Sequence, residues 1–122
     1  MANPNIVNVT EIYGNTLVAL ATNASANSQN VVVNAQSSGK IYKINALYVS
    51  NYQGTNAADI TINHRTGANE FSIASTVSVA ADTTLVLITK DSSIYLLENC
   101  QINMASSINS ALSVTCSWDE IN

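Results

Sequence analysis

Residues 101–119 have the sequence QINMASSINSALSVTCSWD, and this stretch decides the fold class. Apolar side chains occupy even positions in both of its halves, and small or polar side chains occupy the odd positions between them. Side chains of a β-strand alternate between the two faces of a sheet, so each half is predicted to be a strand with one buried face. The Ser- and Asn-rich segment between the halves favours a turn. We therefore expect an antiparallel hairpin here.

Both cysteines of the chain, Cys100 and Cys116, belong to this expected hairpin. If the turn is centred on Asn109, Cys116 lies opposite Ile102, and Cys100 is only its diagonal neighbour. Diagonal neighbours are about 7–8 Å apart, which is too far for a disulfide. This register predicts two buried free thiols, whereas a shift of the turn by one residue would place the two cysteines opposite each other.

The rest of the chain consists of short runs of β-forming residues separated by turn signals. We expect strands at 5–13 (or an extended arm), 16–21, 31–33, 40–51, 58–65, 70–79, 85–88 and 94–97. A turn is expected at Gly14-Asn15 and a mobile loop at 23–30. The fold class is therefore all-β, an antiparallel β-sandwich of about 8–10 short strands that is jelly-roll-like, with an immunoglobulin-like sandwich as the second choice. Residues 1–122 form a single domain, with residues 1–8 as the candidate N-terminal arm.

Two of the expected strands carry a further prediction. In 40–51, the apolar side chains change from even to odd positions near Asn45-Ala46. This change indicates either a β-bulge or a strand whose outer face is covered by a neighbouring subunit. The apolar run 85–88 is typical of a central strand that is buried on both faces.

Charge is scarce in this sequence. Charged residues make up 10% of the chain, against about 25% in an average protein. Four basic residues in a chain with a net charge of −4 cannot form the cationic face that nucleic acid or an anionic membrane requires. The first residues lack the features of a signal peptide and no stretch is long enough to span a membrane, so we expect assembly in a cytoplasm.

No residue pattern indicates catalysis, a metal site or a cofactor. His64 is the only histidine, and it extends an apolar strand face, where an ordinary hydrogen bond is expected. Without a second base or ligand nearby, nucleophilic catalysis and zinc binding are not predicted. Tyrosine is favoured in protein interfaces. The candidate interface residues are Ile6 of the arm with Tyr42, Tyr48 and Tyr52.

Five segments resemble small virion proteins of tailed phages, especially those of cyanophages. They are SGKIYKIN (38–45), VSN (49–51), GTNAADIT (54–61), DSSIYL (91–96) and SVTCSWDEI (113–121). The resemblance implies a non-enzymatic virion structural protein, most simply a capsid decoration or cement protein. Its expected partners are the phage major capsid protein or other virion proteins and further copies of itself, and its expected location is the virion, assembled in the host cytoplasm. A tail-fibre or adhesion module that binds host surface glycans is the alternative.

Overall fold

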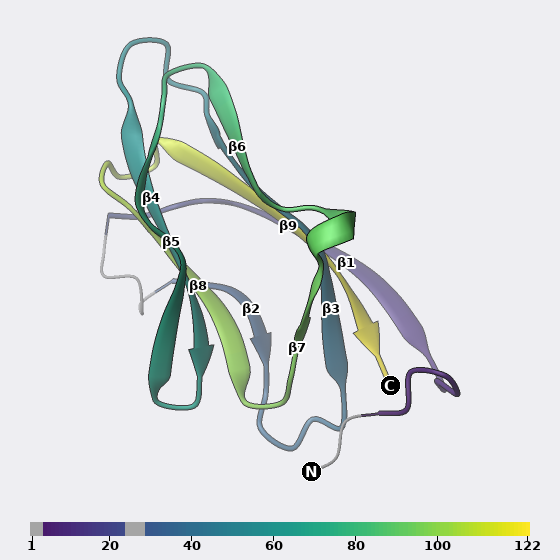
Figure 1. Cartoon of the computed structure of the whole chain (residues 1–122). Helices are drawn as coiled ribbons and strands as arrows, with labels where there is room; N and C mark the ends of the chain where they lie inside the picture. Colours follow the sequence, from purple (N-terminus) through teal and green to yellow (C-terminus); the bar gives the residue numbers. More distant parts are fainter. Residues whose placement is uncertain (1–3, 24–28) are drawn as a thin grey trace.

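The structure, a computed structural model, describes residues 4–23 and 29–122. Two antiparallel sheets pack face to face (Figure 1), which confirms the predicted all-β sandwich. Sheet A has the strand order β1-β9-β3-β6, with β7 also paired to β3, and sheet B has the order β2-β8-β4-β5. The strands are β1 (Ile12–Leu20), β2 (Asn30–Asn34), β3 (Ile41–Asn51), β4 (Ala58–Thr66), β5 (Asn69–Val79), β6 (Thr83–Ile88), β7 (Ile94–Leu96), β8 (Cys100–Ser106) and β9 (Leu112–Ile121), and a 3-10 helix spans Lys90–Ser92.

The strands pair in a nested order. β1 pairs with β9, β2 with β8, β3 with β6 and β7, and β4 with β5. Each strand of the first half is thus matched by a strand of the second half, as in a long ribbon folded back at the β4–β5 turn. Two further pairings, β9 with β3 and β8 with β4, close the ribbon into two sheets. This wrapped ribbon is the jelly-roll arrangement that we expected.

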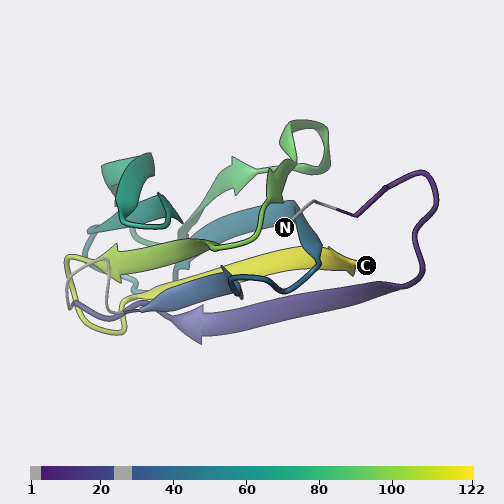
Figure 2. The ribbon, with the colours of Figure 1, turned by 90° about the horizontal axis from the view of Figure 1, so that it is seen from below.

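The expected hairpin at 101–119 is wrong. β8 belongs to sheet B and β9 to sheet A, so the segment 107–111 crosses from one sheet to the other. The even-numbered side chains from Cys100 to Ser106 and from Leu112 to Cys116 are buried, as predicted. The two strands lie in different layers of the sandwich (Figure 2). Alternation is a property of a single strand, and it predicts the buried face without predicting the neighbour.

The core lies between the two sheets, and both contribute fully buried side chains. Both cysteines are free and buried. This confirms the predicted free thiols, although Cys100 and Cys116 lie in different sheets and not in one hairpin. Burial raises the pKa of the Cys116 thiol to about 12. The largest side chains with no more than traces of exposed surface are Ile44, Leu47, Val49, Ile60, Ile62, Val79, Leu96, Ile102, Met104, Leu112 and Val114.

A β-bulge accounts for the phase change in β3. The register between β3 and β9 shifts between Ile44 and Ala46, which leaves Asn45 as the extra residue. Because of this extra residue, Ile44 on one side and Leu47 on the other both point into the core with no exposed surface. The Asn45 side chain donates to Asp119 Oδ2 at 3.1 Å. Of the two explanations that the sequence leaves open, the bulge is therefore the one that the structure shows.

Three local predictions differ from the structure. Gly14-Asn15 is no turn, because β1 continues straight through it and pairs with β9 along its whole length. The first strand accordingly begins at Ile12, and residues 5–10 are not in a strand. β6 is an edge strand of sheet A, not a central strand, and Val86 is 55% exposed. Most of the loop expected at 23–30 lies outside the described residues.

Candidate functional site

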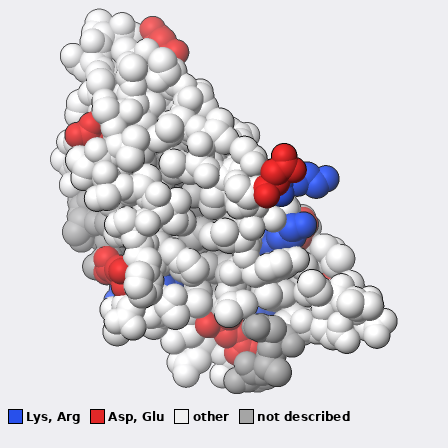
Figure 3. Space-filling model, viewed as in Figure 1, with Lys and Arg blue, Asp and Glu red and all other residues white. Residues whose placement is uncertain are grey.

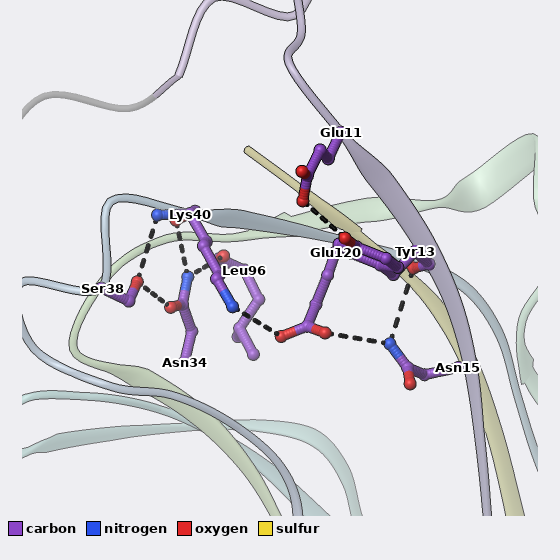
Figure 4. A network of polar contacts seen from close by, with 8 residues as sticks. All are labelled: Glu11, Tyr13, Asn15, Asn34, Ser38, Lys40, Leu96 and Glu120. Atoms are coloured by element: carbon purple, nitrogen blue, oxygen red, sulfur yellow. Dashed lines mark hydrogen bonds and ion pairs between the residues drawn. The ribbon is translucent and has the colours of Figure 1, made fainter.

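A chain of polar contacts crosses the end of the sandwich where β1 starts and β9 ends (Figure 4). At its centre, the Glu120 carboxylate accepts a hydrogen bond from Asn15 Nδ2 at 3.2 Å and lies 3.5 Å from Lys40 Nζ. A hydrogen bond with Tyr42, together with Lys40 and Asn15, holds the pKa of Glu120 below its usual value. Burial, with the adjoining Glu120 carboxylate, raises the pKa of Tyr42 to about 12. These contacts link β1, β3 and β9.

Contacts next to this network hold residues 10 and 11, where the N-terminal segment joins β1, against the end of the chain at Asn122. The Tyr13 hydroxyl donates to Glu11 Oε2 at 2.5 Å, and this bond with the Glu11 charge raises the pKa of Tyr13. The backbone N–H of Thr10 donates to the carbonyl of Asn122 at 2.7 Å, and that of Asn122 donates to the carbonyl of Glu11 at 3.0 Å. Residues 4–9 extend from this fixed point without regular structure.

Two buried asparagines tie the sheets together at opposite crossovers. Asn34 Nδ2 donates to the carbonyls of Lys40 and Leu96, each at 3.0 Å. Asn51 Nδ2 donates to the carbonyls of Asn56 and Val79, each at 2.9 Å. Both asparagines have at most 1% of their surface exposed, so their bonds are not exchanged with solvent. These contacts stabilise the scaffold that presents the outer faces of the sandwich.

Much of the outer face of sheet A lacks charged side chains. Cross-strand partners on this face form three rows, which follow from the register of β1, β9, β3 and β6. Charged side chains begin only in the next row, where Lys43 and Asp119 are partners. We call these three rows the uncharged face. Its residues are Val18, Thr115, Tyr48 and Val86 in the first row, Leu20, Ser113, Ser50 and Thr84 in the second, and Thr16, Ser117 and Ala46 in the third.

The uncharged face carries exposed apolar side chains at both of its edges. Val18 on β1 is 67% exposed and Val86 on β6 is 55% exposed, and Tyr48 lies between them. Leu20 on β1 is also exposed, at 44%, and apart from it and Ala46 the rest of the face presents hydroxyl groups of serine and threonine. Figure 3 shows that, on the side in view, the few charged side chains form small groups with uncharged surface between them. A surface of this composition can be covered by another protein without burying an unpaired charge.

The four candidate interface residues do not form one surface. Ile6 is 52% exposed in the irregular N-terminal segment. Tyr42 is mostly covered and takes part in the Glu120 network. Tyr48 lies on the uncharged face, and Tyr52 lies beyond the end of β3, where its hydroxyl donates to the carbonyl of Ser110 at 2.5 Å. Only Tyr48 therefore belongs to the surface described above.

Val18 and Val86 are surface residues that the local sequence pattern does not indicate. Val18 belongs to an apolar run, and the apolar run 85–88 predicts that Val86 is buried. The sequence signal for them is the alternation of Ser113, Thr115 and Ser117 with buried residues in β9, which indicates that one face of sheet A is exposed. That signal is informative only once the neighbours of β9 are known.

The hydrogen bond expected for the His64 side chain is not formed at its Nε2 atom. Its Nε2 atom is buried and has no partner among the described residues. His64 pairs with Phe71 on β5 and with Ile102 on β8. Across the part of the chain that the structure describes, no three His, Cys, Asp or Glu side chains converge on a possible metal site. No ligand-sized cavity is found there.

The described residues contain no helix that is long and apolar enough to cross a membrane. Compared with family models, with curated proteins and with solved structures, the chain matches none.

Proposed function

We propose that this protein is a non-enzymatic structural protein of a tailed-phage virion, a decoration or cement protein that binds the capsid shell. The observation that carries this proposal is the uncharged face of sheet A. Val18, Tyr48 and Val86 stand in one cross-strand row of this face with hydroxyl-bearing side chains around them. The resemblance of segments between residues 38 and 121 to phage virion proteins is the reason for proposing a tailed-phage particle.

The uncharged face suits attachment to a large protein surface. Its two edge valines and its central tyrosine would supply apolar contact area, and its hydroxyl groups can exchange hydrogen bonds with a partner backbone. A stable interface of ordinary size covers roughly 800 Å² on each partner. Attachment across the joints between capsid subunits would add such area at each joint, and so slow the opening of the shell.

The rigid scaffold supports this role. The asparagines at the two crossovers and the Glu120 network hold both ends of the sandwich. The uncharged face therefore changes little on binding, and association does not require the ordering of its strands. The major capsid protein is the proposed partner.

Two measurements test the proposal. Mass spectrometry of purified phage particles should detect the protein, and its absence from the particle would overturn the assignment. Addition of purified protein to particles that lack it should restore binding, with Val86→Glu weakening binding at least tenfold. Val33→Glu is the matched control, because Val33 is 45% exposed on the edge strand β2 of the other sheet. Equal binding by both variants would exclude the uncharged face. Binding to host glycans by a protein found outside the shell would instead support an adhesion module.

A further inference from the structure

We propose that β1 is a dimerisation strand, whose open edge pairs antiparallel with β1 of a second copy of the chain. The two-fold axis of this pairing would pass beside Asn15. The proposal concerns the backbone edge of sheet A and does not depend on what the uncharged face binds.

The backbone groups at the open edge can be assigned from the two ends of the strand. Beyond one end of β1, the N–H of Ala21 donates to Leu112, and beyond the other, Glu11 exchanges bonds with Asn122. In an antiparallel pair, successive residues direct their N–H and C=O groups alternately toward the partner and away from it. The register of β1 with β9 is unbroken between these ends. Odd-numbered residues therefore bond β9, and even-numbered residues direct their backbone groups to the open edge.

The edge of β1 lacks the features by which edge strands avoid pairing. It contains no charged residue, no proline and no bulge over its nine residues. Edge strands are usually protected by charge, shortness or irregularity. In sheet B, β2 is only five residues long and has a register shift, and β5 has two register shifts and a positive φ of 50° at Thr76. Figure 2 shows β1 at the margin of the sandwich, with no other described strand beyond it.

The side chain of Gln29 defines where the open edge ends. Its Nε2 donates to the carbonyl of Leu20 at 2.9 Å, and its Oε1 accepts from the N–H of Thr22 at 2.8 Å. This amide thus occupies the edge at that end as a further strand would. The residues whose N–H and C=O groups both remain open are Ile12, Gly14, Thr16 and Val18.

This set of four residues is symmetric about Asn15, which is why a second copy of β1 fits it. An antiparallel partner centred on Asn15 pairs Ile12 with Val18 of the second copy, and Gly14 with Thr16 of the second copy. Each of these pairs exchanges two backbone hydrogen bonds, so every open group of these four residues is satisfied and the bond from Gln29 is kept. A two-fold axis produces such a self-complementary contact.

The side chains agree with this register. Ile12 is 56% exposed and Val18 is 67% exposed, and the pairing would place these two apolar side chains side by side on the outer face. Gly14 would stand opposite the larger Thr16. Since the strand has no charged residue, two copies meet without repulsion between like charges. Dimerisation would join two copies of sheet A into one continuous sheet.

The test is the mass of the full chain in solution, measured by sedimentation equilibrium over a range of concentrations. We expect a dimer that Thr16→Pro dissociates, because proline removes an N–H that points to the open edge and leaves the bonds to β9 in place. Val18→Lys should weaken the dimer at least tenfold. Val86→Lys, at the far edge of the same row, should leave it unchanged.

The register has its own test. Oxidation of Asn15→Cys should link two chains, because a central pair without backbone bonds brings its Cα atoms to about 4.5 Å, within disulfide range. Val18→Cys should not link to itself, since the two copies of Val18 would lie about 20 Å apart. A monomeric wild-type chain, a dimer that survives Thr16→Pro and Val18→Lys, or a dimer lost on deletion of residues 1–8 would overturn the proposal. Dimerisation is measured without particles, so its failure is distinct from failure to bind a shell.

Discussion

Asn34 Nδ2 donates to the carbonyl of Leu96 at 3.0 Å across 62 residues of sequence, and neither residue has exposed surface. Asn34 ends β2 in sheet B, and Leu96 ends β7 in sheet A. One side-chain amide therefore joins the two layers of the sandwich where no backbone pairing can, since backbone pairing runs within a sheet. Its second bond, to the carbonyl of Lys40, fixes the connection that leads into β3.

Replacement of Asn34 should destabilise the fold substantially. Asn34→Ala leaves two carbonyls without their donor, and each buried unsatisfied group costs about 1–3 kcal/mol, so we expect a loss of about 2–6 kcal/mol in the free energy of unfolding. Urea denaturation measures this loss. Asn45→Ala is the control, because it removes only the bond to Asp119 and should cost about 1 kcal/mol or less. Equal losses for the two variants would contradict the role of Asn34.

Deletion of Asn45 should leave the chain folded. Asn45 is the extra residue of the bulge, so without it Ile44 and Ala46 become neighbours, β3 alternates regularly, and Leu47 and Val49 still face the core. The expected loss is that of the bond to Asp119, about 1 kcal/mol in the free energy of unfolding. Circular dichroism, the dispersion of amide NMR signals and urea denaturation report the outcome. An unfolded deletion variant would show that the fold requires the bulge.

Stability should fall in acid partly through Glu120. Its pKa is held below the usual 4.5 in the folded chain, so the folded state binds the proton less readily than the unfolded state does. The contribution is complete above about pH 4.5 and is lost as the pH falls through the lowered pKa. Glu120→Gln should reduce the slope of unfolding free energy against pH in this range. Identical slopes for variant and wild type would mean that Glu120 contributes nothing.

Tyr52 and Tyr48 should respond differently to loss of the hydroxyl. Tyr52→Phe removes the bond to the carbonyl of Ser110, with an expected loss of about 1 kcal/mol in the free energy of unfolding. Tyr48→Phe should leave stability within about 0.5 kcal/mol, because Tyr48 is exposed on the uncharged face and is not part of the core. Thermal denaturation of the pair gives the comparison. A larger effect at Tyr48 than at Tyr52 would reverse these assignments.

The native thiols should react only when the chain opens. Cys116 has no exposed surface and a pKa of about 12, so at pH 8 only about one thiol in ten thousand is ionised. In the variant Cys100→Ala, labelling of Cys116 by a disulfide reagent should be slow in buffer and complete within minutes in concentrated urea. Since both thiols are free in the fold, reducing agent should not change the unfolding midpoint. Rapid labelling in buffer would show an open path to Cys116.

Local patterns predicted the strands well. Alternation in 112–119 identified the core face of β9, and the change of phase at Asn45 identified the bulge. Both are decided by which side chains must avoid water within a single strand. The prediction of a turn at Gly14-Asn15 was wrong for a physical reason. A Cβ at Gly14 would meet only Asp119 at 3.8 Å, so this glycine is tolerated in the strand without being required for a turn.

Which strands lie side by side could not be predicted from local sequence patterns. The segment 107–111 is compatible both with a hairpin turn and with a crossover between sheets, and the choice depends on β1, β3, β2 and β4 as competing partners. The position of β6 at an edge has the same origin, because an apolar run does not reveal how many strands flank it. The uncharged face could not be predicted either, since its rows combine strands that are far apart in sequence.

The central position of β9 in sheet A delays the folding of this sheet until the last strand has been synthesised. β9 is the centre of sheet A, with β1 on one side and β3 on the other, yet it is made after both of them. Until Ile121 has emerged from the ribosome, the edges of β1 and β3 that β9 will occupy remain unpaired, and each is a site for pairing with another nascent chain. The chain therefore completes sheet A only after translation of residue 121. If translation stalls earlier, the nascent chain exposes the unpaired edges of β1 and β3, which can pair with other chains.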